Sequence, residues 1–355
     1  MVNLGLGMIF FYLLFPFFKL SPKTNLVLNT FIFSALFLIW RKLFYSLFSS
    51  RFLNKVVVIG QGPPVQELTK EITGRPYLGY KLLALNADQD LLSQIQEKKI
   101  DTLIVPGDLP ADSRLTKELY QCLPARINFM DWAKAYEIIC NKIPIYSVSQ
   151  TWFLENLKEG QKQFYDKIKR AEDMILAGIL LIITLPLWPL IALAVKLEDR
   201  GPVIYRQKRI GKDRKPLLLL KFRSMKIGAE ESTGPVWAKK EDPRVTKTGK
   251  WLRRLHIDEL PQMINIIRGD ISLVGPRPER PEFVEQLEKE IPHYHIRHLI
   301  KPGFTGWAQI KFRYGRTIME AQEKFQYDLY YLKNRGLFLD LGILLKTFQL
   351  FLKKE

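Results

Sequence analysis

The sequence predicts an α/β protein with membrane helices: an N-terminal transmembrane hairpin, a small doubly wound parallel-sheet module and a mainly helical C-terminal part. Three observations lead to this fold class. Two apolar segments open the chain, strands and helices alternate between residues 55 and 130, and a third apolar segment has basic residues on both sides. The 355 residues suffice for two or three structural units. We expect a hairpin at 1–48, an α/β module at 52–145, a linker at 146–166 and a last domain at 167–355.

The hairpin is predicted from the apolar segments Leu4–Phe18 and Asn25–Trp40, which a short polar turn separates. Each is shorter than the ~20 residues of a comfortable membrane span. A signal peptide fits poorly, because a basic n-region and a small-residue cleavage site are both missing. Basic residues follow the second segment, among them Arg41, Lys42 and Arg51. The positive-inside rule therefore puts the downstream chain in the cytoplasm.

The α/β module is predicted from short apolar runs that alternate with helical patterns. Strands are expected at 55–60, 81–85, 102–105 and 126–130, and helices at 65–72, 91–98 and 113–122. Strands separated by helices predict a parallel sheet of the doubly wound type. The loop at Gly60 and Gly62 begins like a dinucleotide fingerprint, but Val65 stands where the third glycine belongs and two prolines remove amide donors. A structural or regulatory role is favoured, with nucleotide binding as the alternative.

A connector is expected from Asp131 to Tyr165, and after it the apolar segment Met174–Leu197 contains Pro186 and Pro189. A straight helix of this length would be ~36 Å long, enough to cross the hydrocarbon. Basic residues on both flanks favour the cytoplasm for both ends, so we expect a helix that enters, breaks at the prolines and returns. Neighbouring groups such as Thr184 must satisfy the backbone there. The alternative is an ordinary kinked transmembrane helix.

Two adjacent carboxylates, Asp258 and Glu259, lie in a strongly basic neighbourhood. The apolar positions 260, 263, 264 and 267 follow the i, i+3, i+4, i+7 spacing of a buried helix face. Asp258 then takes the N-cap position and Gly269 the C′ position. Both carboxylates should meet solvent at the positive end of the helix dipole, which favours their ionised form. Such a pair suits an anionic nucleophile or a metal ligand, although an aspartate before a helix is often only a cap.

Composition points to negatively charged partners. The formal net charge of +18 suits nucleic acid, anionic lipid or phosphorylated substrates. Nucleic acid is disfavoured because no helix-turn-helix, zinc-finger or RNA-binding signature accompanies the charge. Cys122 and Cys140 form no CxxC pattern and are expected to be buried free thiols. The four histidines fit no zinc template.

Five segments carry a family resemblance: KFRSM from Lys221, DPRVTKTGKWLRR, IDELPQ around Asp258, SLVGPRPERPEF and KPGFTGWAQ. In this order they resemble the bacterial sugar transferases, the monotopic polyprenyl-phosphate phosphoglycosyl transferases that begin exopolysaccharide and O-antigen synthesis. The resemblance runs from about Tyr165 to the C-terminus. It implies a monotopic catalytic domain at 167–355 with a re-entrant membrane helix at 174–197, broken at Pro186 and Pro189. It further implies the cytoplasmic face of the bacterial inner membrane, and a Rossmann-like (CoA-binding-like) module at 52–145 without catalytic chemistry.

The resemblance also implies a reaction, in which a sugar-1-phosphate passes from a UDP-sugar to undecaprenyl phosphate and UMP is released. Asp258 would attack the sugar-bearing phosphate and form a covalent phosphosugar intermediate. Mg²⁺ would neutralise the diphosphate, with Glu259 as its first protein ligand and Asp258 as the second. The expected phosphate contacts are Lys221, Arg223 and Arg277. Arg313 is a weaker candidate, because the sequence around it departs from the common sequence of the family.

The expected partners are a UDP-sugar, undecaprenyl phosphate and membrane lipid, without nucleic acid; a homodimer is compatible with the sequence. Galactose, glucose and N-acetylated amino sugars all stay candidates for the transferred sugar. Two other classes of function stay open: a membrane-tethered nucleotide sensor, and a non-enzymatic scaffold of a polysaccharide assembly complex. The tail at 337–352 is expected to be an interfacial amphipathic helix, with a core helix as the alternative.

Overall fold

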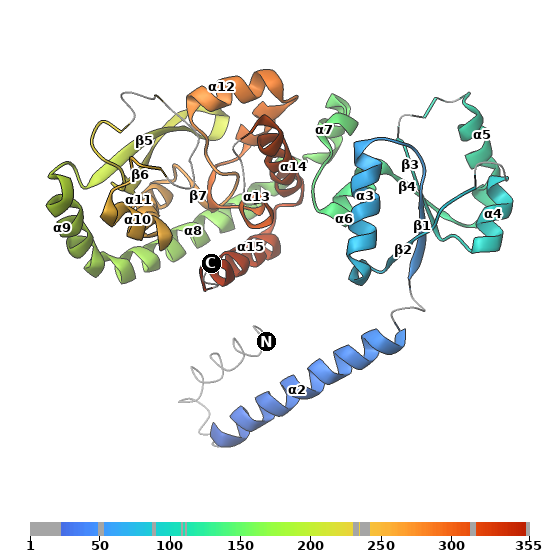
Figure 1. Ribbon diagram of the computed structural model, residues 1–355, viewed down its shortest axis with the longest axis horizontal. Helices are drawn as coiled ribbons and strands as arrows, with labels where there is room; N and C mark the ends of the chain where they lie inside the picture. The colour runs from blue at the N-terminus through green and yellow to red at the C-terminus, as the bar shows by residue number, and fades with distance from the viewer. Residues whose placement is uncertain are drawn as a thin grey trace. The chain divides into compact units, whose positions relative to one another are not determined.

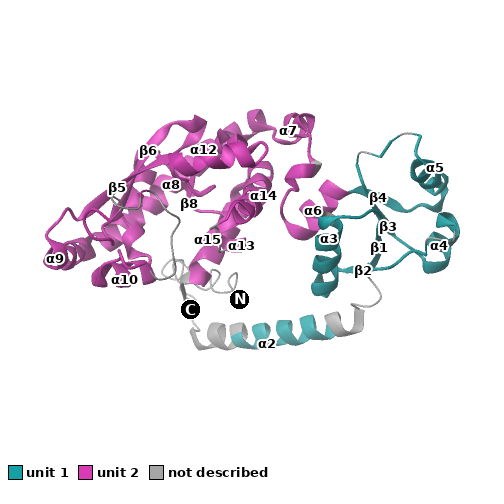
Figure 2. Cartoon of the chain, turned by 45° about the horizontal axis from the view of Figure 1, so that its top comes forward, with its two compact units in different colours: residues 1–131 teal, residues 132–355 magenta. Residues whose placement is uncertain are grey.

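The computed structural model of the protein describes residues 23–48, 53–86, 90–107, 109–110, 112–229, 234, 242–312 and 317–352. It is a mixed α/β structure with a parallel sheet, and it divides into two compact units, Met1–Asp131 and Trp132–Glu355 (Figure 2). The first arm of the predicted hairpin, Leu4–Phe18, lies outside the described residues. The second arm falls within helix α2 (Lys23–Phe48). The hairpin itself stays a prediction.

The first unit contains the predicted parallel sheet. Its strands pair in the order β2-β1-β3-β4, all parallel: β1 (Asn54–Val58), β2 (Tyr80–Leu82), β3 (Thr102–Val105) and β4 (Asn128–Asp131). Three helices connect them: α3 (Pro63–Gly74), α4 (Leu91–Lys98) and α5 (Arg114–Gln121). Figure 1 shows α3 on one side of the sheet and α4 and α5 on the other, as in a doubly wound fold.

The core of this unit follows from the alternation of side chains along β1. Val57 packs with Leu103 of β3 and with Ile95 and Leu119 of the two helices on that side. Val56 points to the opposite face and is fully buried. At the end of β1, Gly60 and Gly62 adopt φ angles of 124° and 113°, which favour glycine.

The segment expected to be a connector is folded and belongs to the second unit. It contains α6 (Trp132–Cys140) and α7 (Gln150–Asn156), and side chains such as Ile143, Ile145 and Phe153 are buried in the core of that unit. The backbone amide of Ile143 donates to the carbonyl of Gln326 at 3.1 Å. Short helices with 3₁₀ turns between them carry no sustained helical period, so the sequence pattern does not show them.

The long apolar segment is broken where its prolines predict. Helix α8 (Gln163–Thr184) ends at a 3₁₀ turn, Leu185–Leu187, and α9 (Trp188–Asp199) leaves in another direction (Figure 1). The hydroxyl of Thr184 donates to the carbonyl of Leu180 at 2.8 Å. Among the described residues, the helical run Gln150–Asp199 is long and apolar enough to cross a membrane, and only 11% of its most apolar window is buried.

The rest of the second unit consists of two short strand pairs and the remaining helices. β5 (Ile204–Ile210) pairs antiparallel with β6 (Pro216–Phe222), and β7 (Ser272–Val274) pairs parallel with β8 (Gly303–Thr305). The helices are α10 (Lys247–Arg254), α11 (Gln262–Arg268), α12 (Pro281–Glu290), α13 (Trp307–Lys311), α14 (Ile318–Asn334) and α15 (Leu337–Leu352). Residues of α8, α11 and α14 form the centre of its core: Ala177, Met263, Ile266, Phe325 and Leu329.

Helix α15 combines the two alternatives that its sequence leaves open. Asp340 is 1% exposed and accepts hydrogen bonds from the Tyr165 hydroxyl, the Lys169 ammonium and the Tyr331 hydroxyl, each at 2.7 Å. Apolar side chains such as Phe338 are exposed on the same helix. One side of α15 is therefore fixed to the core, while another presents apolar surface.

Candidate active site

A cavity of about 790 Å³ opens in the second unit. Strands β5 and β6, the 3₁₀ turn Ile257–Glu259, the segment after β7, and helices α12 and α14 contribute its lining. Five of the predicted site residues line it: Lys221, Arg223, Asp258, Glu259 and Arg277. The sixth predicted side chain, Arg313, lies outside the described residues. The structure therefore brings together residues from three segments that are far apart in the sequence.

The turn that holds the two carboxylates differs from the sequence prediction. His256 adopts a left-handed conformation with φ of 54°, the 3₁₀ turn Ile257–Glu259 follows, and α11 begins only at Gln262. Asp258 is therefore not the N-cap of this helix; Pro261 holds that position without a side-chain hydrogen bond. Because the helix starts later, Met263 and Ile266 are its most buried apolar side chains. Gly269 terminates the helix with φ of 88°, as predicted.

The expected exposure of the carboxylates is also wrong: Asp258 is 7% and Glu259 9% exposed. Burial in the first place, and the charge of Glu259 in the second, raise the pKa of Asp258 above its usual range. The predicted dipole effect does not hold it down, because helix fields fall off within one turn and α11 starts four residues later. The Asp258 carboxylate accepts no hydrogen bond from any described residue, and it faces the cavity.

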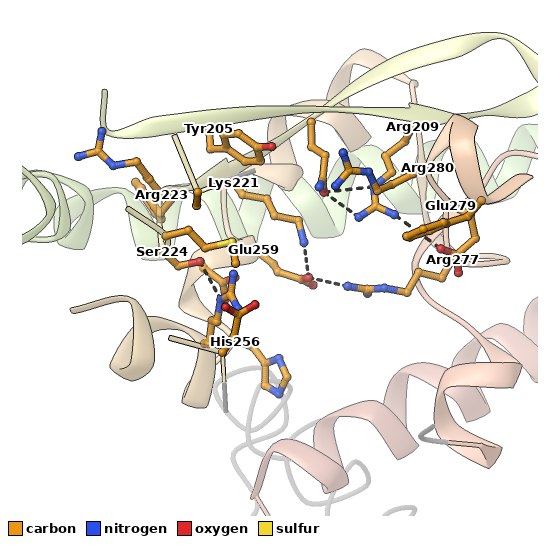
Figure 3. Close-up of a pocket in the computed structure, with 18 of the residues that line it drawn as sticks. Tyr205, Arg209, Lys221, Arg223, Ser224, His256, Glu259, Arg277, Glu279 and Arg280 are labelled. Atoms are coloured by element: carbon orange, nitrogen blue, oxygen red, sulfur yellow. Dashed lines mark hydrogen bonds and ion pairs between the residues drawn. The ribbon is translucent and has the colours of Figure 1, made fainter. Parts of the chain in front are cut away.

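Glu259 is placed between two cations. Its Oε1 accepts from Lys221 Nζ at 2.8 Å and from an Arg277 guanidinium nitrogen at 2.7 Å. Figure 3 shows these side chains reaching Glu259 from two different sides, Lys221 from above and Arg277 from the right. Burial opposes ionisation of Glu259, but Arg277 and Lys221 together hold its pKa well below the usual range. Glu259 therefore favours its ionised form, and its carboxylate holds two cations of the cavity wall in place.

Arg223 has a different environment. Its guanidinium donates to the carboxylate of Asp199 at the end of α9, and in Figure 3 it points away from Glu259. A second guanidinium nitrogen, Nη1, is buried and has no hydrogen-bond partner in the part of the chain that the structure describes. Arg223 lines the cavity, so it can still meet an anion there.

Sequence reasoning missed several cations of the cavity wall, namely Arg209, Arg280, Arg297 and Lys324. Burial lowers the pKa of Arg209 to about 10, although Glu279 lies 3.6 Å away. Arg280 stands in the motif after β7, and that motif could have suggested it. Lys324 and Arg209 belong to an ordinary amphipathic helix and an ordinary strand, where no local signal marks them.

Carboxylates of the cavity are the candidate ligands for Mg²⁺. In the described ranges, no three Asp, Glu, His or Cys side chains gather into a complete ligand set. Mg²⁺ is commonly bound by one or two carboxylates together with substrate phosphates and water. Asp258 accepts no hydrogen bond, and Oε2 of Glu259 is likewise without a donor among the described residues. These two carboxylates therefore fit a magnesium ion that arrives with its phosphate ligands.

Comparison of the sequence with known proteins shows its family. The sequence profile of the family described as bacterial sugar transferase matches residues 164–354. The chain is 45% identical over 317 residues to the UDP-glucose:undecaprenyl-phosphate glucose-1-phosphate transferase of Escherichia coli (strain K12), covering 82% of this chain and 66% of that protein. It is 31% identical over 320 residues to the transferase of the same description from Xanthomonas campestris pv. campestris, with 83% and 66% covered.

A relative with a different sugar in its name is similar as well. The UDP-N-acetylgalactosamine-undecaprenyl-phosphate N-acetylgalactosaminephosphotransferase of Aeromonas hydrophila is 40% identical over 218 residues, which cover 58% of this chain and 51% of that protein. The chain thus spans about half to two thirds of the length of these relatives. Because the family profile covers more than half of the chain, including every predicted site residue, the chain belongs to the bacterial sugar transferase family.

Proposed function

We propose that the protein transfers a sugar-1-phosphate from a UDP-sugar to a polyprenyl phosphate such as undecaprenyl phosphate, and releases UMP. One observation carries the proposal: the Asp258 carboxylate is buried, accepts no hydrogen bond from the described residues and faces a large cavity with cationic walls. The family and the names of its members, which are undecaprenyl-phosphate sugar-1-phosphate transferases, support it.

Both proposed substrates are anions, and the cavity supplies the matching charge. Arg277 is 40% exposed and presents a planar fork that can bind two phosphate oxygens together. Lys221 is more buried and acts as a point charge. Because Glu259 holds both side chains, their positions are set before substrate arrives. Phosphoryl transfer depends mainly on such positioning and on charge neutralisation.

The proposed reaction has two displacements. An oxygen of ionised Asp258 attacks the sugar-bearing phosphorus, and the bond to the bridging oxygen breaks so that UMP leaves with the electron pair. An oxygen of the lipid phosphate then attacks the phosphosugar on Asp258, and the carboxylate leaves. Mg²⁺, bound by Glu259 and Asp258, would supply neutralisation of the diphosphate. The cations Lys221 and Arg277 hold the transferred phosphate in line during both steps.

The site is expected to work at a membrane surface, on its cytoplasmic face. Helices α8 and α9 carry exposed apolar side chains such as Ile182, Ile183 and Leu190. Arg223 links the cavity directly to Asp199 at the end of α9. A helix pair that enters the membrane and returns at Pro186 would bring the cavity to the level of the lipid phosphate.

The test is UMP release from a panel of UDP-sugars, beginning with UDP-glucose and UDP-N-acetylgalactosamine, which the names of the relatives suggest. With the correct sugar and without lipid, the enzyme should release up to one equivalent of UMP, and mass spectrometry should find the phosphosugar on Asp258. Addition of undecaprenyl phosphate should then start turnover. If lipid is required for the first UMP, direct transfer without a covalent intermediate is the better account. Absence of UMP release with every UDP-sugar, with and without lipid, would contradict the function.

A further inference from the structure

A second cavity of about 190 Å³ lies in the same unit and shares no lining residue with the first. It lies among α8, the segment after β5, strand β7, residues 300–301 before β8 and the C-terminal end of α14. Its lining carries more positive than negative side chains: Lys169, Arg170, Lys212, Lys301 and Arg335 against Asp166 and Asp173. An excess of positive charge around a small cavity suits an anionic ligand.

Some of these cations already have partners and some do not. Lys169 pairs with Asp340 at 2.7 Å, and Arg335 pairs with Asp166 and Glu159. Lys301 and Lys212 make no ion pair with any described residue. Their charges are therefore available to a ligand.

Arg170 and Lys301 approach each other closely. The guanidinium of Arg170 donates to the carbonyls of Ile266 and Ile267 at the end of α11. A Cβ atom built on Gly269 would lie 3.3 Å from Arg170 Nη2 and 3.3 Å from Lys301 Nζ, so the two nitrogens are at most twice that distance apart. Burial first, and the charge of Arg170 second, lower the pKa of Lys301. An anion between the two cations would relieve this repulsion.

A buried hydroxyl provides an independent observation. Ser272 is 2% exposed, lines the cavity, and its Oγ has no hydrogen-bond partner among the described residues. The backbone amide of Ser272 donates to the carbonyl of Pro302 at 2.8 Å, which brings Ser272 beside the segment that carries Lys301, and both residues line the same cavity. A buried hydroxyl without a partner costs free energy, and a ligand oxygen would remove this cost by accepting a hydrogen bond from it.

The cavity lies where α8 changes from polar to apolar. Asp173 lines the cavity, and the next turns expose Ile175 and Ile179 at 61% and 48%. At a membrane surface this level corresponds to the phosphate groups of the lipids. We propose that Lys301, Arg170 and the hydroxyl of Ser272 form a binding site for a phosphate group, separate from the catalytic cavity, which takes either a phospholipid headgroup or free phosphate.

Phosphate matches this site better than a carboxylate does. Its several oxygens can accept from an ammonium, a guanidinium and a hydroxyl at the same time. Lys212, an exposed residue of the lining, can bind a further oxygen. The proposal is independent of the transferred sugar and of the catalytic steps.

The experiment uses the full chain in maltoside micelles, which contain no phosphate. Thermal unfolding is followed with increasing inorganic phosphate at constant ionic strength, and separately with phosphatidylglycerol or with diacylglycerol of the same acyl chains. The variants are Lys301→Ala and Ser272→Ala, with Lys289→Ala, an exposed lysine of α12, as the matched control. Native mass spectrometry counts bound lipid in each sample.

The wild type and Lys289→Ala should be stabilised by phosphatidylglycerol but not by diacylglycerol. Lys301→Ala should bind roughly tenfold more weakly, because it loses one charge-assisted hydrogen bond. Ser272→Ala should be as stable as the wild type without ligand, since only an unpaired hydroxyl is lost, and should bind several-fold more weakly. Stabilisation by inorganic phosphate alone would identify free phosphate as the ligand of the same site.

Two results would overturn the proposal. The first is equal binding of phosphate and phosphatidylglycerol by the wild type and Lys301→Ala. The second is an equal loss in Lys289→Ala, which would show that the lipid responds only to the net charge of the protein.

Discussion

Asp258 and Glu259 are neighbours in the chain, yet their environments drive their ionisation in opposite directions. Glu259 is held ionised by Arg277 and Lys221 against the cost of burial, whereas burial and the charge of Glu259 raise the pKa of Asp258. Pairs of titratable groups that are shifted apart in this way commonly take different roles in one site. In the proposed mechanism, Glu259 is the carboxylate that positions the cations and Asp258 is the carboxylate available to substrate.

Replacement of Asp258 by asparagine tests the proposed role of this carboxylate, because it changes a carboxylate oxygen to an amide nitrogen. Asparagine is nearly isosteric with aspartate but cannot act as the nucleophile, so turnover should fall below roughly a few per cent of the wild-type rate. The midpoint of thermal unfolding should not decrease, because a buried carboxylate that accepts no hydrogen bond from the described residues is replaced by a neutral group. Glu259→Gln should instead reduce activity and alter its Mg²⁺ dependence. Substantial turnover by a folded Asp258→Asn variant would refute the nucleophile assignment.

The acid limb of the first half-reaction should report the raised pKa of Asp258. A protonated carboxyl cannot attack phosphorus, so the rate falls as pH decreases through the pKa of Asp258 in the free enzyme. Because that pKa is raised, the fall should begin at a higher pH than the usual aspartate value of 3.8 predicts. Rapid-quench measurement of the first equivalent of UMP across the acid range gives this curve. A rate that stays constant down to that usual value would show that Asp258 is not shifted.

Buried His298 should make stability depend on pH. Burial is the main cause that lowers its pKa from 6.5 to about 3, so the folded protein holds it neutral where the unfolded chain binds a proton. As pH falls below 6.5 the unfolded state is favoured, by about 1.4 kcal/mol per pH unit for one proton. His298→Gln should flatten this dependence in urea unfolding, while His295→Gln, at an exposed position, should not. Equal slopes in the wild type and His298→Gln would contradict the buried neutral state.

At the scale of helices and strands, the sequence predicted correctly those features that local residues determine. The parallel sheet of the first unit was predictable because β1 and β3 are short apolar runs between helical patterns, and the break at Pro186 because proline removes an amide donor. The start of α11 was misplaced because apolar spacing does not reveal the left-handed His256 and the 3₁₀ turn that follow α10. The N-cap is Pro261 instead of the predicted Asp258, so the helix begins three positions later than predicted.

The site was predictable in its residue types, but not in its contacts. Family motifs pointed to Lys221, Glu259 and Arg277 one by one, whereas their joint hydrogen bonds depend on the packing of β6 against the turn before α11. Arg209 and Lys324 reach the cavity only through strand pairing and helix packing. Pairings between distant segments leave no local pattern in the sequence, so this part of the site needed the structure.

The helix pair α8 and α9 leads to a prediction about topology. Replacement of both Pro186 and Pro189 by leucine removes a cost of ~3 kcal/mol to a straight helix, so a spanning helix should compete with the re-entrant path. Cysteines placed at the exposed positions Gln161 and Lys212 report the sides, and the native Cys122 and Cys140 are buried. In the parent, an impermeant thiol reagent should label neither site in intact cells. In the double variant one of them should become labelled, and transferase activity should fall with it.

Labelling of one site in the parent would identify an ordinary transmembrane helix. The basic residues on both flanks would then have to be explained without the positive-inside rule. A variant that stays protected at both sites yet loses activity would show that the prolines act on the geometry of the cavity rather than on topology.

At the scale of the whole molecule, the second unit has its own core and its own cavity. All lining residues of the proposed catalytic cavity lie between residues 202 and 328, within the unit Trp132–Glu355. Among the described residues, the first unit contributes none of them. We therefore predict that the catalytic chemistry belongs to the second unit, and that the α/β module at the N-terminal side has a structural or regulatory role.

This division predicts how truncated chains behave, and the position of the cut decides the result. A chain that begins at Trp132 keeps α6 and α7 and should retain sugar-phosphate transfer in detergent. A chain that begins at Tyr165, where the family resemblance starts, loses the buried side chains of Ile143, Ile145 and Phe153. Burial of each such side chain stabilises a protein by about 1.5–3 kcal/mol, and the total stability of a domain is only about 5–15 kcal/mol, so this shorter chain should unfold or aggregate. Circular dichroism and UMP release measured on both chains separate the outcomes. Equal activity of the two would show that α6 and α7 are dispensable, and a folded but inactive chain from Trp132 would assign the α/β module a part in catalysis.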